Sequence, residues 1–136
     1  MPKDSVENNA IAVVTTYLPK QGYEVQNVCR GKKPNSEHGG FDLIARKPGE
    51  EITIEVKGTT VPWGIPDPYV TEFDKTTLRL VADFLYVVYF LGSEPPFICA
   101  IPREALKPED IVLKFGYRIK GRFKNKRSLE PYLRQL

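Results

Sequence analysis

"GGFDLIARKPGEEITIEVKG", residues 39–58, holds two apolar runs on either side of the sequence Lys-Pro-Gly-Glu. In that sequence Pro48 restricts φ to the value that a turn needs, and Gly49 permits the positive φ of a type II turn. The flanking runs are short and rich in residues that favour strands. The stretch therefore predicts a β-hairpin, with strands over residues 41–46 and 51–57.

Charged side chains interrupt both apolar runs of this hairpin. If Pro48 and Gly49 are the two central turn residues, the numbers of paired residues sum to 97, and Asp42 lies opposite Glu55. Because side chains alternate along a strand, one face carries the charges and the other face is apolar. The charged face has Asp42, Ile44, Thr53, Glu55 and Lys57, and the apolar face has Phe41, Leu43, Ala45, Ile52, Ile54 and Val56. Two carboxylates that face each other repel unless a cation or a proton settles between them.

These carboxylates have the chemistry of a magnesium site. Two hard oxygen ligands, with room for water and a substrate phosphate, describe Mg²⁺ (or Mn²⁺) rather than zinc. Lys57 follows Glu55 by two residues and points to the same side, where its ammonium would stabilise developing negative charge or orient a metal-bound water. The alternative is a salt bridge from Lys57 to Asp42 or Glu55 on an exposed strand face. The common register of all three residues favours the metal site.

Asp42, followed after the hairpin by the sequence Ile-Glu-Val-Lys-Gly at residues 54–58, resembles the motif of the PD-(D/E)XK, restriction-endonuclease-like nuclease superfamily. Within that superfamily, "GGFDLIA…ITIEVKGT" is most similar to the domain at the C-terminus of plant NO VEIN proteins and their prokaryotic relatives. Phe41 stands where the motif name has proline, which is a common relaxation. The resemblance implies a metal-dependent nuclease, with Asp42 and Glu55 as metal ligands and Lys57 as the catalytic lysine.

The same resemblance implies a third carboxylate, because in that superfamily a helix before the hairpin often contributes a glutamate to the metal site. Glu7, near the start of the first expected helix, occupies the matching place. Glutamate is also favoured in the first turn of any helix by the helix dipole, so both interpretations of Glu7 stay open. The superfamily core has the order αβββαβ, and it covers roughly residues 6–101 of this chain.

Hydrophobic periodicity and chain breakers predict a compatible order of elements. Ser5 is expected to cap a first helix that ends before Pro19 and Gly22. After it we expect a strand over residues 23–28, the hairpin, a proline-rich loop over 61–68, a helix from Thr71 to Val81 with Asp74 in a capping box, strands over 84–91 and 97–101, a basic strand region over 111–124, and a helix over 129–135 capped by Ser128. The expected fold class is α/β, an α+β sandwich with a central mixed β-sheet flanked by helices.

Length and composition predict a single domain. A chain of 136 residues with 41% hydrophobic content can bury one core. The sequence has no apolar run of about 18 residues and no signal-peptide pattern, so a cytoplasmic protein without membrane contact is expected. Cys29, Cys99 and the single His38 lack the spacing of a zinc site, and both cysteines are expected to be reduced structural thiols.

Positive charge gathers at the C-terminal end, in an extension over residues 111–136. From Lys114 onward eight basic residues stand against Glu130 alone, a net charge of +7, whereas the rest of the chain has 12 basic and 16 acidic residues, a net charge of −4. If the segment is extended, its even-numbered residues form one basic face: Lys114, Arg118, Lys120, Arg122, Lys124 and Lys126. Such a stripe suits a nucleic-acid phosphate backbone. A solvated edge strand protected by lysines is the alternative.

The sequence thus favours a magnesium-dependent nuclease in restriction, repair or recombination, with DNA preferred over RNA on the resemblance alone. The alternative is a non-catalytic nucleic-acid-binding module, or a subunit of a larger assembly. A homodimer would supply the two active sites that cutting both strands requires. Trp63 in the proline-rich loop either stacks on a base or packs the loop onto the core, and the sequence does not decide between these roles.

Overall fold

The computed structural model describes residues 3–28, 41–66, 74, 77, 79–107, 111–113, 117–119 and 126–136. Its elements, in chain order, are α1 (Lys3–Lys20), β1 (Glu24–Asn27), β2 (Leu43–Lys47), β3 (Glu50–Thr59), β4 (Phe84–Tyr89), β5 (Phe97–Pro102), the 3₁₀ helix η2 (Arg103–Ala105), β6 (Ile111–Leu113), β7 (Tyr117–Ile119), α2 (Lys126–Leu129), the 3₁₀ helix η5 (Glu130–Tyr132) and β8 (Leu133–Arg134). No helix among these residues is both long and apolar enough to cross a membrane.

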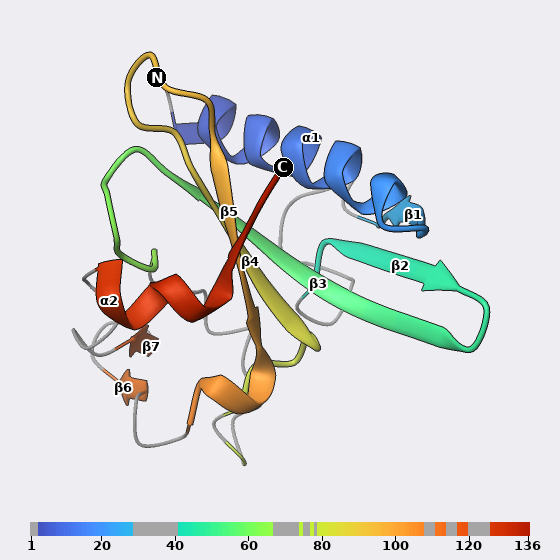
Figure 1. The fold of residues 1–136 in the computed structure, drawn as a ribbon. Coiled ribbons are helices and arrows are strands. Elements are labelled where there is room, and N and C mark those ends of the chain that lie inside the picture. The colour runs from blue at the N-terminus through green and yellow to red at the C-terminus, as the bar shows by residue number, and fades with distance from the viewer. Residues whose placement is uncertain are drawn as a thin grey trace.

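Six strands form one sheet in the order β1-β2-β3-β4-β5-β8. β3 and β4 run parallel, and the other neighbouring strands are antiparallel, so the sheet is mixed. α1 lies across this sheet (Figure 1). β6 and β7 pair with each other in a separate antiparallel sheet. The predicted α/β class with a central mixed sheet is confirmed.

Two apolar clusters hold the sheet, one on each face. The cluster under α1 contains Ala10, Val14, Tyr17, Leu18, Leu43, Ala45, Ile54, Val56, Tyr86, Val88, Ile98 and Ala100. The opposite cluster contains Leu80, Ala82, Leu85, Val87, Tyr89, Cys99, Ile101, Leu106 and Leu129. Alternate residues of β4 belong to different clusters, so this apolar strand is covered on both faces, as its sequence predicts. Burial raises the pKa of the Cys99 thiol to about 11.

The hairpin of β2 and β3 has the predicted register. Its pairs run from Leu43 opposite Ile54 to Lys47 opposite Glu50, and each pair of numbers sums to 97. Gly49 has a φ of 80°, the positive value that the turn requires. Local turn chemistry therefore fixes how these two strands meet.

α1 begins before the predicted cap and ends in a Schellman motif. Ser5 lies inside the helix rather than at its N-cap. At the other end Gly22 has a φ of 91°, and its N–H donates to the carbonyl of Pro19 at 3.0 Å. The Tyr23 N–H donates to the carbonyl of Leu18 at 3.2 Å. These two bonds satisfy the last helical carbonyls and turn the chain into β1.

The helix predicted from Thr71 to Val81 falls largely outside the described residues, and its described end is not helical. Asp74 Oδ1 accepts a hydrogen bond from the Thr77 N–H at 3.0 Å. The Asp74 N–H donates to the Arg79 carbonyl at 2.8 Å. The extension of that helix to Val81 is therefore wrong, because residues 79–81 are not helical and the bond from Asp74 to Arg79 runs opposite to the helical direction, in which the later residue donates to the earlier one.

Two predictions for the C-terminal extension are also wrong. Residues 111–124 do not form one extended strand, because Leu113 pairs with Tyr117 and the chain reverses between β6 and β7. Ser128 lies within α2 instead of capping a helix over residues 129–135. Pro131 lies at the start of η5, where it lacks the N–H that would continue α2. β8 then pairs with β5 at the sheet edge.

Gly58 allows α1 to approach β3 closely. A Cβ at Gly58 would lie 2.9 Å from the Cβ of Ala10, 2.9 Å from the carbonyl oxygen of Val6 and 3.0 Å from Val6 Cγ1. The backbone oxygen and the buried Ala10 methyl have little room to move in a close-packed interior. The glycine that ends the hairpin motif therefore sets the spacing between helix and sheet.

We expect Gly58→Ala to lower the free energy of unfolding by about 1–3 kcal/mol, because the added methyl overpacks this contact. Gly64→Ala is the matched control, since a Cβ at Gly64 meets nothing within 4 Å. Chemical denaturation of both variants measures the difference. Equal stability of Gly58→Ala and the wild type would contradict the close contact.

Candidate functional site

The predicted site residues gather where β3 changes neighbours. β2 pairs with β3 from Glu50 to Ile54, and β4 pairs with β3 from Ile54 to Thr59. Asp42 directly precedes β2, while Glu55 and Lys57 follow Ile54 in β3. Figure 1 shows β3 as the long strand that extends from β2 to the centre of the sheet. The candidate site therefore lies at a fork between two strand pairs.

A β-bulge changes the predicted position of Asp42. Leu43 pairs with Ile54, and the Asp42 N–H also bonds to the Ile54 carbonyl, at 2.9 Å. Two successive residues thus meet one residue of β3, which breaks the simple alternation. The predicted position of Asp42, directly opposite Glu55, is therefore wrong. Phe41 packs against the cluster on the face away from α1, and its predicted place beside Leu43 is wrong.

The Asp42 carboxylate takes over a role of the β2 backbone. Its Oδ2 accepts a hydrogen bond from the Val56 N–H at 2.8 Å, and this bond is buried. That N–H belongs to the peptide unit that joins Glu55 to Val56. The Asp42 carbonyl in turn accepts from the Val28 N–H at 3.0 Å. Asp42 therefore links Val28, which directly follows β1, to Val56 of β3. Its carboxylate lies beside the peptide unit between Glu55 and Val56.

Glu55 and Lys57 project from the face of β3 that is opposite α1. Their neighbours Ile54 and Val56 belong to the cluster under α1, and alternation sends Glu55 and Lys57 the other way. Lys57 Nζ lies 3.7 Å from Glu55 Oε1. The predicted shared face of Glu55 and Lys57 is confirmed.

Burial distinguishes these three side chains from the other charged residues whose burial the structure describes. Asp42 is 4% exposed, Glu55 is 1% exposed and Lys57 is 5% exposed, and no other charged residue of that set is buried. A buried ion pair costs desolvation energy that its own attraction often fails to repay. The salt bridge of the alternative interpretation is present between Lys57 and Glu55, but it is buried, so the exposed setting expected for it is wrong.

The donor chemistry of the fork fits a hard divalent cation. Two carboxylates and one ammonium leave a net charge of −1 in a buried region, and carboxylate oxygens are the ligands that Mg²⁺ prefers. The described residues contain no group of three His, Cys, Asp or Glu side chains placed to hold a metal ion. Glu7 lies half-buried in the first turns of α1, and its role as a further ligand stays a prediction.

The predicted basic stripe is only partly visible. Arg118 lies in β7, opposite Val112 of β6, and Lys126 begins α2. Lys114, Lys120, Arg122 and Lys124 lie outside the described residues. Because the chain reverses between β6 and β7, the six basic residues do not lie on one continuous extended strand. Nucleic-acid binding by these residues stays a prediction.

Trp63 packs the proline-rich loop onto the core. Its ring centroid lies 5.1 Å from that of Phe97 and 5.9 Å from that of Tyr89. The Tyr89 hydroxyl donates to the Gly64 carbonyl at 2.6 Å, and Trp63 itself has a φ of 54°. Lys126 Nζ lies 5.7 Å from the centre of the Trp63 ring. Together these contacts hold Trp63 in a left-handed backbone conformation that residues other than glycine rarely adopt.

Asp83 has a structural role that the sequence analysis did not identify. Asp83 Oδ2 accepts from the N–H of Thr53 at 2.8 Å and from its hydroxyl at 3.1 Å. Asp83 Oδ1 accepts from Arg103 Nη2 at 2.9 Å. No signal in the sequence indicates this link, because it depends on the parallel register of β3 with β4.

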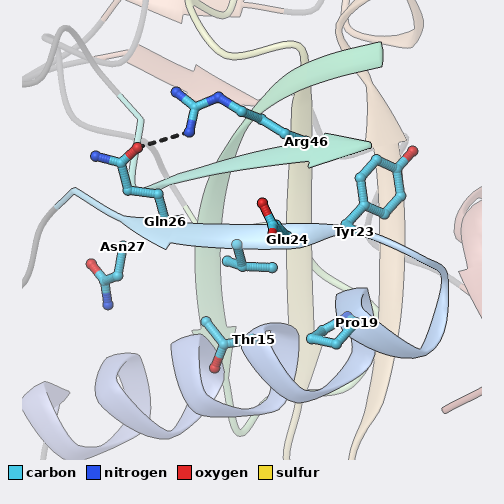
Figure 2. Close-up of a pocket in the computed structure, with 8 residues that line it drawn as sticks. Thr15, Pro19, Tyr23, Glu24, Gln26, Asn27 and Arg46 are labelled. Carbon is cyan, nitrogen blue, oxygen red and sulfur yellow. Dashed lines mark hydrogen bonds between the residues drawn. The ribbon is translucent and has the colours of Figure 1, made fainter. Parts of the chain in front are cut away.

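A groove of about 500 Å³ lies between α1 and β1, away from the fork (Figure 2). It is lined by Thr15, Pro19, Tyr23, Glu24, Val25, Gln26, Asn27 and Arg46. Arg46 Nη1 donates to Gln26 Oε1 at 2.9 Å, and Arg46 Nε donates to Glu51 Oε1 at 2.5 Å. None of the lining residues is a predicted site residue.

Comparison with known proteins gives one match. The family model described as "Protein NO VEIN, C-terminal" matches residues 6–100, which is more than half of the chain and contains the whole fork. No curated protein and no solved structure matches the chain.

We expect Lys57→Met to lower the free energy of unfolding by about 3–5 kcal/mol, because it leaves buried carboxylates without their cation. Adding Glu55→Gln should recover part of that loss, since the double variant removes both partners. A denaturation cycle over the two single variants and the double variant measures the coupling.

The matched control is the exposed pair of Arg46 and Glu51 on the same hairpin, whose closest atoms lie 2.5 Å apart. Its cycle should give a coupling of about 0–1 kcal/mol because solvent screens exposed pairs. A coupling no larger for Lys57 and Glu55 than for this control would contradict a buried charge pair.

Proposed function

This chain belongs to the NO VEIN C-terminal family, and we propose that it is a magnesium-dependent nuclease with Asp42, Glu55 and Lys57 at its active site. One observation carries the proposal: among the residues whose burial the structure describes, these three are the only buried charged ones. Charges that cost folding stability are kept where they serve chemistry. Resemblance of their sequence pattern to the PD-(D/E)XK motif supports the same conclusion.

Asp42 and Glu55 would hold Mg²⁺ or Mn²⁺. Glu7 lies in α1, on the face of the sheet away from Glu55, so the proposal of Glu7 as a third carboxylate rests on the resemblance alone. A bound ion would act as a Lewis acid and would lower the pKa of a water bound to it. The bond from the Val56 N–H fixes the Asp42 carboxylate, so that little reorganisation is needed when a cation arrives. The negative charge of the two carboxylates favours a divalent cation over the bulk monovalent ions.

Lys57 would act on the phosphate. Its ammonium lies 3.7 Å from Glu55 Oε1 and cannot itself ligate the cation. In a buried site its charge stabilises the extra negative charge that develops as a phosphodiester is attacked. An ammonium there can also donate a hydrogen bond that orients the attacking water. Asp42, Glu55 and Lys57 thus have separate tasks.

DNA is the proposed substrate in preference to RNA, on the resemblance to the superfamily. The basic C-terminal extension would bind phosphates without reading base sequence. A homodimer would bring two active sites to the two strands of a duplex. Roles in restriction, repair or recombination would all need such an activity.

A second candidate is a nucleic-acid-binding module, or an assembly subunit, that does not turn over. The exposed fractions of 1–5% at Asp42, Glu55 and Lys57 favour it, because a reacting phosphate must reach these side chains. Cleavage assays separate the two functions, since both predict binding and only the nuclease predicts product.

We expect the protein to cleave a member of a mixed DNA and RNA panel in the presence of Mg²⁺ or Mn²⁺, and to stop when a chelator is added. Asp42→Asn and Glu55→Gln should abolish cleavage and weaken metal binding, because each removes a charged ligand. Lys57→Met should abolish cleavage but retain metal binding. Cleavage, metal titration and nucleic-acid affinity are measured together on variants that circular dichroism shows to be folded.

Exposed residues of the same hairpin provide the controls. Glu51→Gln and Lys47→Met change the same side-chain types outside the fork, and both should cleave at the wild-type rate. If the wild type binds nucleic acid but cleaves nothing, the binding module is correct. A wild-type rate for Lys57→Met would exclude the role proposed for the lysine.

We further expect affinity for duplex DNA to fall steeply with salt, at about 0.9 in the log–log slope for each phosphate contact. Reversing the charge at Arg118, Lys120 and Arg122 should flatten this slope, because binding with fewer phosphate contacts releases fewer counterions from the DNA. Fluorescence anisotropy across a salt series measures it. An unchanged slope in the triple variant would assign these residues to solubility.

A further inference from the structure

Asp83 stands where two strand pairings begin. β3 and β4 pair from Ile54 opposite Phe84, and β4 and β5 pair as far as Phe84 opposite Pro102. Asp83 directly precedes Phe84. If each pairing continued by one residue, Asp83 would lie opposite Thr53 in the pairing of β3 with β4 and opposite Arg103 in the pairing of β4 with β5. The Asp83 carboxylate bonds to both residues.

The bonds to Thr53 run in both directions. Asp83 Oδ2 accepts from the Thr53 N–H at 2.8 Å and from the Thr53 hydroxyl at 3.1 Å. The Asp83 N–H donates to Thr53 Oγ1 at 3.0 Å. A threonine and an aspartate thus replace the backbone bonds of one more ladder position, and they tolerate no shift of one strand along the other.

Arg103 fixes the other side of Asp83. Its Nε donates to the Ala82 carbonyl and its Nη2 to the Val81 carbonyl, each at 3.0 Å. Nη2 also donates to Asp83 Oδ1 at 2.9 Å, and the Arg103 N–H donates to the Asp83 carbonyl at 2.9 Å. The planar guanidinium therefore clamps the chain that leads into β4.

Register at this point decides where Glu55 and Lys57 project. Glu55 lies two residues beyond Thr53, at roughly 3.3 Å per residue along the strand. Glu55 pairs with Leu85 and Lys57 with Val87, and a slip of one residue would match the face of β3 that carries these charges with the opposite face of β4. Pairing of β3 with β4 is the only parallel pairing of the described sheet, and parallel strands cannot be joined by a tight turn of the kind that sets the register of a hairpin.

We propose that Asp83 is a positioning residue for the active site: its bonds to Thr53 and Arg103 fix the register that places Glu55 and Lys57 beside Asp42. This inference rests on the proposed nuclease function for its catalytic consequence. Its structural consequence, a fixed position of β3 against β4 next to the fork, can be measured without any reaction.

The test compares Asp83→Asn, Thr53→Val and Thr53→Ser with the wild type. Thr53→Val keeps the shape of the side chain and removes the hydroxyl, whereas Thr53→Ser keeps the hydroxyl. Glu104→Gln is the control, because Glu104 is an exposed carboxylate next to Arg103 that lies outside the network. Each variant is assayed for kcat and KM with Mg²⁺ on the panel member that the wild type cleaves, and for amide hydrogen exchange by NMR.

We expect Asp83→Asn to lower kcat by about 10–100-fold through misplacement of the reacting groups, with a much smaller change in KM. Amide protection should fall selectively at Glu55 and Lys57, whose N–H groups point toward β4 like that of Thr53. Protection at Ala45 and Ile52 in the hairpin should change less. Thr53→Val should show a weaker form of both effects, and Thr53→Ser and Glu104→Gln should match the wild type.

The result that would overturn the proposal is an even loss of protection across the sheet, or a folded Asp83→Asn that retains both kcat and the protection of Glu55 and Lys57. A wild type that cleaves nothing defeats the nuclease function instead. In that case the selective exchange pattern still decides whether Asp83 positions these residues.

Discussion

The structure depends on the change of partner along β3, from β2 to β4, at Ile54. The described pairing of β2 with β3 ends at Ile54. The Val56 N–H, which points to the β2 side, therefore needs an acceptor other than the β2 backbone. The Asp42 carboxylate supplies it at 2.8 Å. The fork thus draws one charged group into the interior for a structural reason, and Glu55 and Lys57 follow because strand alternation places them on the face beside it.

Local signals in the sequence predicted the hairpin, its register and the apolar face of β3. Pro48 and Gly49 determine the turn, and the turn determines every pair from Lys47 back to Leu43. The prediction failed at Asp42, because strict alternation assumes that only backbone groups bond across the strands. A carboxylate that competes for the Val56 N–H produces a bulge, and no pattern of apolar residues reveals it.

Non-local contacts account for the other errors. Leu133 and Arg134 lie in β8 because β5 offers an edge with which they pair, whereas the local sequence favoured a helix there. The sequence does not indicate a role for Asp83, yet its carboxylate accepts from the Thr53 N–H on the β4 side of β3. Asp42 does the same for Val56 on the β2 side. The role of Asp83 depends on the register of two strands that are far apart in sequence. Only the role of Asp42 lies within a recognisable motif.

The two acid–base pairs near β3 show the difference between a structural ion pair and a candidate active site. Arg103 Nη2 and Asp83 Oδ1 lie 2.9 Å apart, with 34% and 41% of their side chains exposed, so the pair gains a direct hydrogen bond at small desolvation cost. Lys57 Nζ and Glu55 Oε1 lie 3.7 Å apart with 7% and 2% exposed. That arrangement has the larger desolvation cost and the weaker bond, the reverse of what stability alone favours. Asp42 adds a second negative charge within the same fork. Under the proposed function, a bound cation and an anionic substrate would offset the desolvation cost of holding these three groups together.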